Sequence, residues 1–521
     1  MLDRRQLVQL ASVVSASVWL PRSAWSQTRW SSNPFALGVA SGSPSHDSVV
    51  LWTRLVQPDR QPLLTPDVAV QWEVAHDDQF RHPVASGQSV ALAQLGHCVH
   101  VEVPNLAPDR WYFYRFLSGD ALSATGRTRT FPAPGATVSR LRLSYASCQH
   151  WEHGYFAAHR HMRDEHLDLV MFLGDYIYEY AAPGSAVRPG GRNWLVTLDD
   201  YRSRYALYKS DLDLQAMHAA CPWLVVWDDH EVQNDYAGAT PGDKGPTVAS
   251  FAARRAAAYQ AFYEHMPLRA SVLTRGLGGL ATGAEMRIYG SATYGKLAHL
   301  MWLDDRQYRD AQVCTKDGKR GSSAVNPAQC STWNDAQRSL LGEAQEQWVD
   351  LAFSRSQAQW NVLAQQTAFG QRDSRSGAGQ SLSNDGWDGY ATARHRLLQS
   401  VQRYQLPGLV VLGGDIHANW VGHVKADYSN PASATVGVEF CGTSISSHGG
   451  SNDKLASQLR ENPHFVFADR AHRGYGVVEF TPTQLTTTLR VVDDVTRADS
   501  GISTLAQFVV EAGGSQLERT I

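Results

Sequence analysis

The chain has 521 residues, and at about 150 residues per domain this length predicts two to four domains. Lys and Arg number 47 against 50 Asp and Glu, so the formal net charge of −3 argues against nucleic-acid binding through bulk positive charge. Hydrophobic residues make up 43% and charged residues 19%, which argues against a disordered chain, and 6 cysteines are too few for a disulfide-based scaffold.

The first 26 residues have the composition of an export signal. Arg4 and Arg5 precede a moderately apolar stretch from Leu7 to Leu20, and small residues stand at positions 24 and 26. The paired arginines predict the twin-arginine route, with a chance pair in an ordinary signal or an N-terminal helix as the alternative. We therefore expect contact with the twin-arginine export machinery and a periplasmic or secreted protein. No later segment reaches the ~18 uninterrupted apolar residues of a membrane span, so no span is predicted.

Residues 33–134 predict an all-β domain. Apolar and polar residues alternate over 48–55, 68–76 and 98–103, with prolines and glycines between these segments. The segment from Leu106 to Tyr114 contains Leu-Ala-Pro followed by two tyrosines, which resembles the tyrosine corner of fibronectin-like β-sandwiches. We expect this domain to pack against, or partly cover, the domain that follows.

Strands and helices alternate from about residue 139, which predicts an α/β domain over residues 139–500. A strand over 141–146, a helix over 153–166 and a strand over 169–173 form its first βαβ unit. Further strands are expected at 223–227, 299–303, 360–364 and 409–412, and further helices at 248–265 and 343–354. Residues 501–521 are expected to form a C-terminal tail that packs on the core or covers the functional site. Long loops at 184–193 and 371–389 are expected to control access to that site.

Four of the predicted strands end in polar clusters, at residues 147–149, 174–179, 228–235 and 413–417. Because ligands gather at the carboxyl ends of strands in α/β sheets, we expect these clusters to meet on one rim. Their carboxylates, imidazoles, phenol and thiol together are typical of a multi-metal site. Each cluster alone also fits a structural role: Gly174-Asp175 a turn, 228–231 the first turn of a helix, and Cys148 a small core residue. The joint occurrence of all four favours the metal site.

Two further pairs of residues carry weaker signals. His159 and His161 are two residues apart on a predicted helix and point away from one another, so we expect no shared ligand. Arg306 and Arg309 would either contact phosphate or form surface ion pairs.

The cysteines fall into two sets besides Cys148. Cys314 and Cys330 lie in a Gly/Lys/Ser-rich stretch, and in an oxidising compartment they would form a disulfide, with two free thiols as the alternative. Cys98, Cys221 and Cys441 lie in or beside apolar runs and are expected to be buried thiols.

The motifs in these clusters resemble those of the calcineurin-like metallophosphoesterases, and among them the PhoD-type alkaline phosphatases. The resemblance covers nearly the whole chain, from the twin-arginine signal to the α/β domain. Its motifs are SCQ (147–149), GDYIYE (174–179), WDDHEVQND (227–235), LDDRQYR (303–309), WDGY (387–390), GGDIHANW (413–420) and EFCGTSISS (439–447). The resemblance implies a fibronectin-like all-β sandwich, followed by an α/β metallophosphoesterase core that is a four-layer β-sandwich with helices.

The resemblance also implies a ferric iron (Fe3+). Asp175 would bridge the metals, while Tyr178 would give the iron a phenolate and Cys148 a thiolate. Asp415 would be a further ligand of iron or calcium. The superfamily's paired histidines near this point appear here as Asp415 and His417, and the exchange of imidazole for carboxylate makes the site harder. This fits iron with calcium better than two zinc ions.

Calcium (Ca2+) is the second implied metal. Asp229 stands where the superfamily has an asparagine, so it would either ligate a metal or orient His230. Asn234 then becomes the candidate amide ligand of calcium.

The implied activity is hydrolysis of phosphate monoesters and diesters at alkaline pH, with in-line attack by a metal-bound hydroxide or oxide. His230 or His417 would protonate the leaving alkoxide. Substrates would be small phosphate esters, with phospholipids or nucleotides as further candidates and no stable nucleic-acid binding. Two alternatives remain open. One is a phospholipase D-like phosphodiesterase, and the other is a non-enzymatic exported binding protein that uses the β domain for adhesion.

Overall fold

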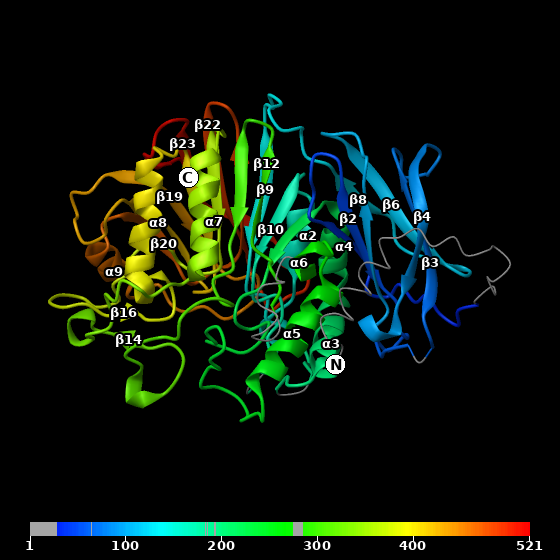
Figure 1. The fold of residues 1–521 in the computed structure, drawn as a ribbon, viewed down its shortest axis with the longest axis horizontal. Helices are drawn as coiled ribbons and strands as arrows, with labels where there is room; N and C mark the ends of the chain where they lie inside the picture. Colours follow the sequence, from blue (N-terminus) through cyan, green and yellow to red (C-terminus); the bar gives the residue numbers. More distant parts are fainter. Residues whose placement is uncertain (1–28, 64, 183, 185, 192–193, 275–284) are drawn as a thin grey trace.

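The computed structural model describes residues 29–521 apart from 64, 183, 185, 192–193 and 275–284. The predicted export signal over residues 1–26 lies outside the described residues. The described chain forms a β-rich N-terminal part, drawn in blue, beside a larger part that contains two sheets and most of the helices (Figure 1). Among the described residues, no helix is both long and apolar enough to cross a membrane.

The larger sheet has ten strands in the order β24-β23-β22-β21-β9-β10-β11-β1-β2-β5. Its centre is a parallel run of three almost fully buried strands, as expected for parallel strands covered on both faces: β9 (Leu141–Ala146), β10 (Leu169–Leu173) and β11 (Trp223–Val226). One side continues with antiparallel β21 (Arg473–Phe480), β22 (Gln484–Val492), β23 (Ile502–Glu511) and β24 (Glu518–Arg519). The C-terminal residues therefore contribute strands to this sheet.

The second sheet has seven strands in the order β12-β13-β15-β17-β19-β18-β20. They are β12 (Gly290–Tyr294), β13 (Ala298–Trp302), β15 (Trp360–Ala364), β17 (Leu409–Gly413), β18 (Asn419–Lys425), β19 (Thr435–Cys441) and β20 (Phe465–Asp469). Apolar side chains of both sheets belong to one core cluster, in which Phe440 of β19 lies 6.4 Å from Phe508 of β23 between ring centroids. A second cluster joins the other face of this sheet to α7 (Gly342–Arg355) and α8 (Ala391–Arg403).

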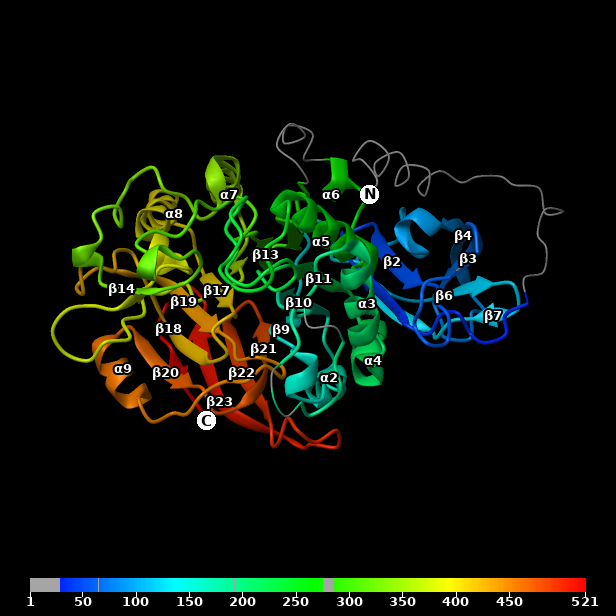
Figure 2. The ribbon, with the colours of Figure 1, turned by 90° about the horizontal axis from the view of Figure 1, so that it is seen from below.

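Most remaining helices lie between the β9–β11 strands and the N-terminal part in both views (Figures 1 and 2). They are α2 (Ala157–Arg163), α3 (Leu198–Lys209), α4 (Leu212–Ala220), α5 (Phe251–His265) and α6 (Ser271–Thr274), while α9 (Leu455–Glu461) lies beside β20. The predicted helix over 153–166 is wrong at its start. Residues 151–153 form a 3-10 turn, and Gly154 follows with a φ of 179°, so the α-helix begins only after this extended residue.

The N-terminal part consists of two facing sheets. One contains β3 (Val68–Ala75), β4 (Pro83–Ala91), β6 (Trp111–Ser118), β7 (Ala121–Leu122) and β8 (Gly126–Arg129). The other is made of β1 (Val39–Gly42), β2 (Val49–Arg54) and β5 (Cys98–Val103). A core cluster that includes Leu51 and Val70 fills the space between them. Because β1 pairs with β11 at Gly42 and Trp223, the second of these sheets is continuous with the ten-stranded sheet.

Candidate metal centre

The four predicted polar clusters lie together at the carboxyl ends of parallel strands from both sheets. β9, β10 and β11 lead into the segments that carry Cys148, Asp175 and Asp229, and β17 of the seven-stranded sheet leads into Asp415 and His417. The strand ends thus meet on one rim, as the sequence predicts.

Two glycines allow the strand ends to approach this closely. A Cβ on Gly174 would lie 2.4 Å from the Cβ of Asp228, and a Cβ on Gly414 would lie 2.3 Å from the Ser147 Oγ. Real Cβ atoms essentially never lie closer than 3.0 Å to such a neighbour, and both distances are shorter than this. The neighbouring strand ends would therefore have to separate to admit a side chain. The contact at Gly414 joins the rim of one sheet to the rim of the other.

Four of the predicted site residues have left-handed backbone conformations. The φ angles are 59° for Cys148, 55° for Asp175, 66° for Asp415 and 51° for His417. Such angles are uncommon outside glycine, and strained residues of this kind cluster at functional sites. The backbone therefore marks the same residues that the motifs select.

Donor atoms of these residues form three overlapping groups, and within each group all atoms lie within 4.8 Å of one another. The groups are Cys148 with Asp175 and His417, Asp175 with Asp229 and His230, and Asp228 with Asp229 and Asp415. Asp175 belongs to the first two groups and Asp229 to the last two, so the groups form a continuous row. Asp228, two residues after the end of β11, lies in the third predicted polar cluster but was not predicted as a ligand.

Tyr178 lies at the first of these groups. Its hydroxyl is 3.0 Å from Asp175 Oδ2 and 3.1 Å from His417 Nε2, and it accepts a hydrogen bond of 2.7 Å from Ser447 Oγ. Burial and the nearby Asp175 carboxylate raise the pKa of the Tyr178 phenol well above its usual value. The phenolate form therefore requires a nearby positive charge.

The residues of the centre fit cation binding. Asp175 Oδ1, Asp228 Oδ2 and Asp229 Oδ1 are buried and have no hydrogen-bond partner among the described residues. Burial, together with neighbouring carboxylates, raises the pKa of Asp175 and of Asp415 well above the usual range. Buried carboxylates this close are costly unless a cation offsets their charge. Carboxylate oxygens with a thiol, a phenol and an imidazole are donors that iron and calcium accept.

His230 is held by a carboxylate behind it. Its Nδ1 lies 2.7 Å from Glu179 Oε2, and the other Glu179 oxygen accepts the backbone N–H of Asn234 at 2.7 Å. Burial lowers the pKa of His230, but the charges of Asp175, Glu179 and Asp229 outweigh it and raise the pKa well above the usual value. These carboxylates favour the protonated ring, and a cation bound by Asp175 and Asp229 would oppose that charge. The structure therefore places the backbone of Asn234 beside the centre, where its N–H is bonded to Glu179.

His417 is arranged differently. Its Nδ1 lies 2.7 Å from the backbone carbonyl of His448, which accepts only from a protonated nitrogen, so Nε2 carries the lone pair of the neutral ring. Burial lowers the pKa of His417 to about 3. Its Nε2 belongs with Cys148 and Asp175 in the first donor group. The two predicted proton donors thus differ in their surroundings: Glu179 pairs with His230 Nδ1, whereas His417 Nε2 faces Cys148 and Asp175.

The prediction of surface ion pairs for Arg306 and Arg309 is wrong, because both side chains are fully buried. Arg306 contacts Asp228, lies 2.8 Å from Asp385 Oδ2, and has further ion pairs of 3.4 Å with Asp415 and 3.6 Å with Asp229. Arg309 pairs with the other oxygen of Asp385 at 2.9 Å. The Arg306 guanidinium therefore neutralises part of the charge of Asp228, Asp229 and Asp415, which form the acidic end of the row of donor groups.

The predicted disulfide is confirmed: Cys314 and Cys330 are bonded, with a Cα–Cα distance of 5.9 Å. The segment it closes lies against the acidic end of the centre. Ser322 Oγ, within this segment, donates to Asp235 Oδ2 at 2.8 Å, and Gln312 Nε2, two residues before Cys314, donates to Asp385 Oδ1 at 2.7 Å. In the part of the chain that the structure describes, the free cysteines are all buried, as predicted: Cys98, Cys148, Cys221 and Cys441.

His159 and His161 take structural roles, as predicted. His159 Nε2 lies 2.8 Å from the Gln149 Oε1, and His161 Nε2 lies 2.8 Å from the Ser500 carbonyl. A structural residue that sequence reasoning missed is Glu231, whose Oε2 accepts the backbone N–H groups of Asp175 at 3.1 Å and Asp228 at 2.8 Å. It ties the ends of β10 and β11 together.

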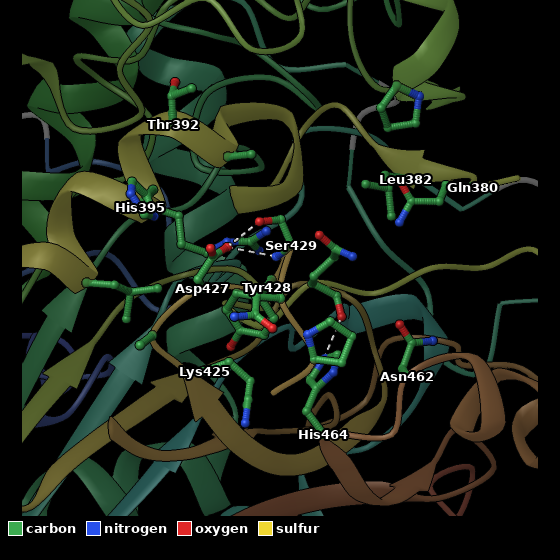
Figure 3. A pocket seen from close by; sticks show the side chains of 18 of the residues that line it. Gln380, Leu382, Thr392, His395, Lys425, Asp427, Tyr428, Ser429, Asn462 and His464 are labelled. Carbon is green, nitrogen blue, oxygen red and sulfur yellow. Dashed lines mark hydrogen bonds between the residues drawn. The ribbon is translucent and has the colours of Figure 1, made fainter. Parts of the chain in front are cut away.

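A large groove of about 1080 Å³ lies elsewhere, around α8 and the end of β18 (Figure 3). Its walls include His395, Lys425, Tyr428 and His464, and the Asp427 carboxylate accepts the Ser429 hydroxyl at 2.6 Å. None of the residues of the three donor groups lines this groove. Its size alone therefore assigns it no part in the chemistry of the centre.

Comparison with known families defines the class of protein. The model described as "PhoD-like phosphatase" matches residues 143–489, and the model described as "PhoD-like phosphatase, N-terminal domain" matches residues 21–132. The chain therefore belongs to the PhoD-like phosphatase family, and it is a phosphoric ester hydrolase.

Individual relatives agree with this assignment. The chain is 45% identical over 500 residues to alkaline phosphatase D of Bacillus subtilis (strain 168), which covers 94% of this chain and 83% of that protein. A solved "Structure of PhoD" is 43% identical, with a TM-score of 0.87, and the match covers 95% of this chain and 93% of that one. The resemblance to PhoD-type alkaline phosphatases is confirmed.

Proposed function

We propose that this protein hydrolyses phosphate monoesters and diesters at alkaline pH with ferric iron and calcium as cofactors. The observation that carries the proposal is the row of three donor groups that share Asp175 and Asp229. Cys148, Asp175, Tyr178 and His417 would hold the iron, because the thiol, phenol and imidazole lie at that end of the row. The all-oxygen end, with Asp228, Asp229 and Asp415, suits calcium, and the Asn234 amide would be a further ligand.

When bound, these cations would supply positive charge to the phosphoryl oxygens and would activate water for in-line attack. The chain's own residues would complete the reaction. The protonated His230, paired with Glu179, would give its proton to the leaving oxygen. His417 would keep its Nε2 lone pair for the iron, because the His448 carbonyl fixes the ring tautomer. Arg306 would hold the carboxylates of the acidic end in place.

The proton-donor role is tested with His230→Ala and with substrates that differ in leaving group. An alkyl phosphate needs protonation of its leaving oxygen, whereas p-nitrophenolate does not. We expect a loss of about 100-fold or more in kcat on the alkyl ester and a much smaller loss on p-nitrophenyl phosphate. Equal losses on both substrates would exclude His230 as the proton donor.

The metals are tested by elemental analysis and visible spectroscopy of the purified protein. Iron bound by a phenolate or thiolate gives a visible charge-transfer band, which we expect Tyr178→Phe to shift or abolish. A colourless protein that contains zinc would contradict the proposal. Release of choline from phosphatidylcholine much faster than phosphate from p-nitrophenyl phosphate would favour the phospholipase D-like alternative.

We also propose export by the twin-arginine route to the periplasm or the medium. The support is the Arg4-Arg5 pair before an apolar stretch, together with the Cys314–Cys330 disulfide, since disulfides persist in oxidising compartments. Replacement of both arginines by lysine should retain the protein in the cytoplasm, as measured by cell fractionation. Unchanged export of this variant would contradict the twin-arginine route.

We further propose that the N-terminal part is a fibronectin-like sandwich and that the larger part is a four-layer arrangement of helices, two sheets and helices. Support for the first comes from the Tyr112 hydroxyl, which donates to the Ala107 carbonyl at 3.2 Å in the manner of a tyrosine corner. Support for the second comes from the core cluster shared by the two sheets. An experimental structure with a different strand order would contradict both.

A further inference from the structure

Three imidazole rings form a continuous stack beside the candidate centre. His150 and His153 lie 3.8 Å apart between ring centroids with 13° between their planes, and His153 and His448 lie 3.8 Å apart with 14° between theirs. At the inner end, the ring of His150 lies 4.4 Å from the ring of Tyr178. We call His150, His153 and His448 the histidine stack.

The local backbone explains why these rings are parallel. Trp151–His153 is a 3-10 turn that His150 caps, and in a 3-10 helix the side chains at positions i and i+3 lie above one another. His150 Nδ1 accepts the backbone N–H of Glu152 at 3.2 Å, and His153 Nδ1 accepts the backbone N–H of His448 at 3.2 Å. Hydrogen bonds therefore fix the inner two rings before any ligand binds.

The stack runs from the buried centre to the surface. His150 is fully buried, His153 is half-buried and His448 is exposed. The imidazole of His448 makes no hydrogen bond or ion pair within the part of the chain that the structure describes, and His153 is its one ring neighbour there. Burial lowers the pKa of His153 to about 4, so its ring is neutral and offers a flat, uncharged face to His448.

The outer ring is tied directly to the centre. The backbone carbonyl of His448 accepts from His417 Nδ1 at 2.7 Å, and the preceding residue, Ser447, donates to the Tyr178 hydroxyl at 2.7 Å. A phosphate ester at the centre therefore has the histidine stack beside it. Two imidazoles separate the exposed face of His448 from Tyr178, so a ring bonded directly to the phosphate would not reach it.

We propose that His448, backed by His153, is a stacking platform for the planar base of a nucleotide substrate, whose ribose provides the spacer between ring and phosphate. This inference rests on the proposed phosphatase function and names its preferred leaving group. Base stacking on an aromatic side chain changes affinity by roughly 5- to 100-fold, which is enough to select nucleotides over esters without a ring. His448 would be a specificity-determining residue and would take no part in proton transfer.

The test compares kcat/KM for a nucleoside 5′-monophosphate, p-nitrophenyl phosphate and glycerol 3-phosphate. We expect the nucleotide-to-glycerol phosphate ratio to fall about tenfold in His448→Ala and to be restored in His448→Phe, which keeps a ring but has no imidazole nitrogen. His46→Ala, an exposed histidine of the N-terminal part, is the matched control and should leave the ratio unchanged. The free nucleoside should inhibit the wild-type protein competitively, with an inhibition constant about tenfold higher in His448→Ala.

The outcomes separate this inference from the proposed function. A wild-type protein that turns over none of the three substrates would contradict the proposed function. Turnover with the same nucleotide-to-glycerol phosphate ratio in wild type and His448→Ala would overturn the platform. Loss of that ratio without rescue by His448→Phe would also overturn it, because stacking would not be the cause. An equal fall in kcat/KM for p-nitrophenyl phosphate and for the nucleotide in His448→Ala would contradict the proposed role of the ribose as a spacer.

Discussion

The two ends of the donor row compensate buried negative charge in different ways. At the Tyr178 end, Cys148, Tyr178 and Asp175 are packed around His417, and no Arg or Lys forms an ion pair with this group among the described residues. At the acidic end, Arg306 pairs with Asp228, Asp385, Asp415 and Asp229. The acidic end is therefore partly neutralised by an arginine, whereas at the Tyr178 end the His230 imidazole faces Asp175 and the dependence on a bound cation is greater. This difference implies that metal loss weakens the Tyr178 end first.

Asp175 belongs both to the Tyr178 end and to the central donor group with Asp229 and His230, so its replacement should have the largest effect. In Asp175→Asn we expect kcat to fall by about a thousandfold, because the shared charged oxygen is lost from two donor groups at once. In chelator-treated protein the same change should raise the thermal midpoint, since it removes a buried carboxylate whose pKa burial has raised. Thermal melts with and without chelator measure this. Asp427→Asn, outside the centre, is the control.

A lower thermal midpoint for chelator-treated Asp175→Asn would mean that the carboxylate is already stabilised without metal. The Tyr178 end would then not depend on a bound cation more than the acidic end does.

Arg306 tests the acidic end directly. Arg306→Met should destabilise the fold by about 3–5 kcal/mol, because it leaves buried carboxylates without their cation. Tyr178→Phe at the other end removes one hydroxyl and should lower the free energy of unfolding by only about 1 kcal/mol while it shifts or abolishes the visible band. Denaturant unfolding of both variants, followed by tryptophan fluorescence, gives the comparison. Equal losses in the free energy of unfolding for the two variants would show that both ends rely on the protein's own charges to the same extent.

The strands of the centre were predictable because each is a short apolar run between polar segments. The predicted strands at 141–146 and 169–173 agree with the structure to the residue, as does 360–364 of the second sheet. The clusters that follow the first two meet because parallel strands end on the same rim. These features depend on local composition and on one general rule of sheet topology.

Features that depend on long-range contacts were not predictable. The burial of Arg306 follows from carboxylates on other segments of the chain, and Glu179 is recognised as the partner of His230 only once the two side chains are placed. The pairing of Gly42 with Trp223, which joins the N-terminal sheet to the core, has no local sequence signal. The histidine stack was missed because the predicted helix began only at residue 153, and the 3-10 turn over 151–153 that aligns the rings was not expected.

The disulfide should affect the acidic end alone. In the double variant Cys314→Ser, Cys330→Ser we expect the free energy of unfolding to fall by about 3 kcal/mol in the loop-entropy model. In the folded protein the change should be greatest in residues 314–330, where Ser322 contacts Asp235. The calcium concentration that gives half-maximal activity should rise severalfold, and the visible band of the Tyr178 end should not change. A shift of that band in the double variant would show that the two ends are coupled more tightly than their charge pairs indicate.

The smallest expected effect concerns a buried cation that, unlike Arg306, has no carboxylate partner among the described residues. Lys209 is buried, and its Nζ lies 4.3 Å from the Trp52 ring centroid and 5.3 Å from that of Tyr176, which follows Asp175. Burial lowers its pKa from 10.5 to about 7. Because the unfolded chain binds this proton more tightly, wild-type stability should rise as the pH increases from about 7 toward 10.5.

Lys209→Met keeps the apolar contacts and removes the charge, so it should stabilise the protein by about 1–2 kcal/mol at pH 7 or below. The gain should shrink as the pH rises and disappear near pH 10.5, where lysine is neutral in both states. Thermal midpoints of both proteins across this range measure the difference. A gain independent of pH would mean that packing, not charge, separates the variants, and a loss at pH 6 would mean that the contacts with Trp52 and Tyr176 stabilise the charged form enough to replace a carboxylate partner.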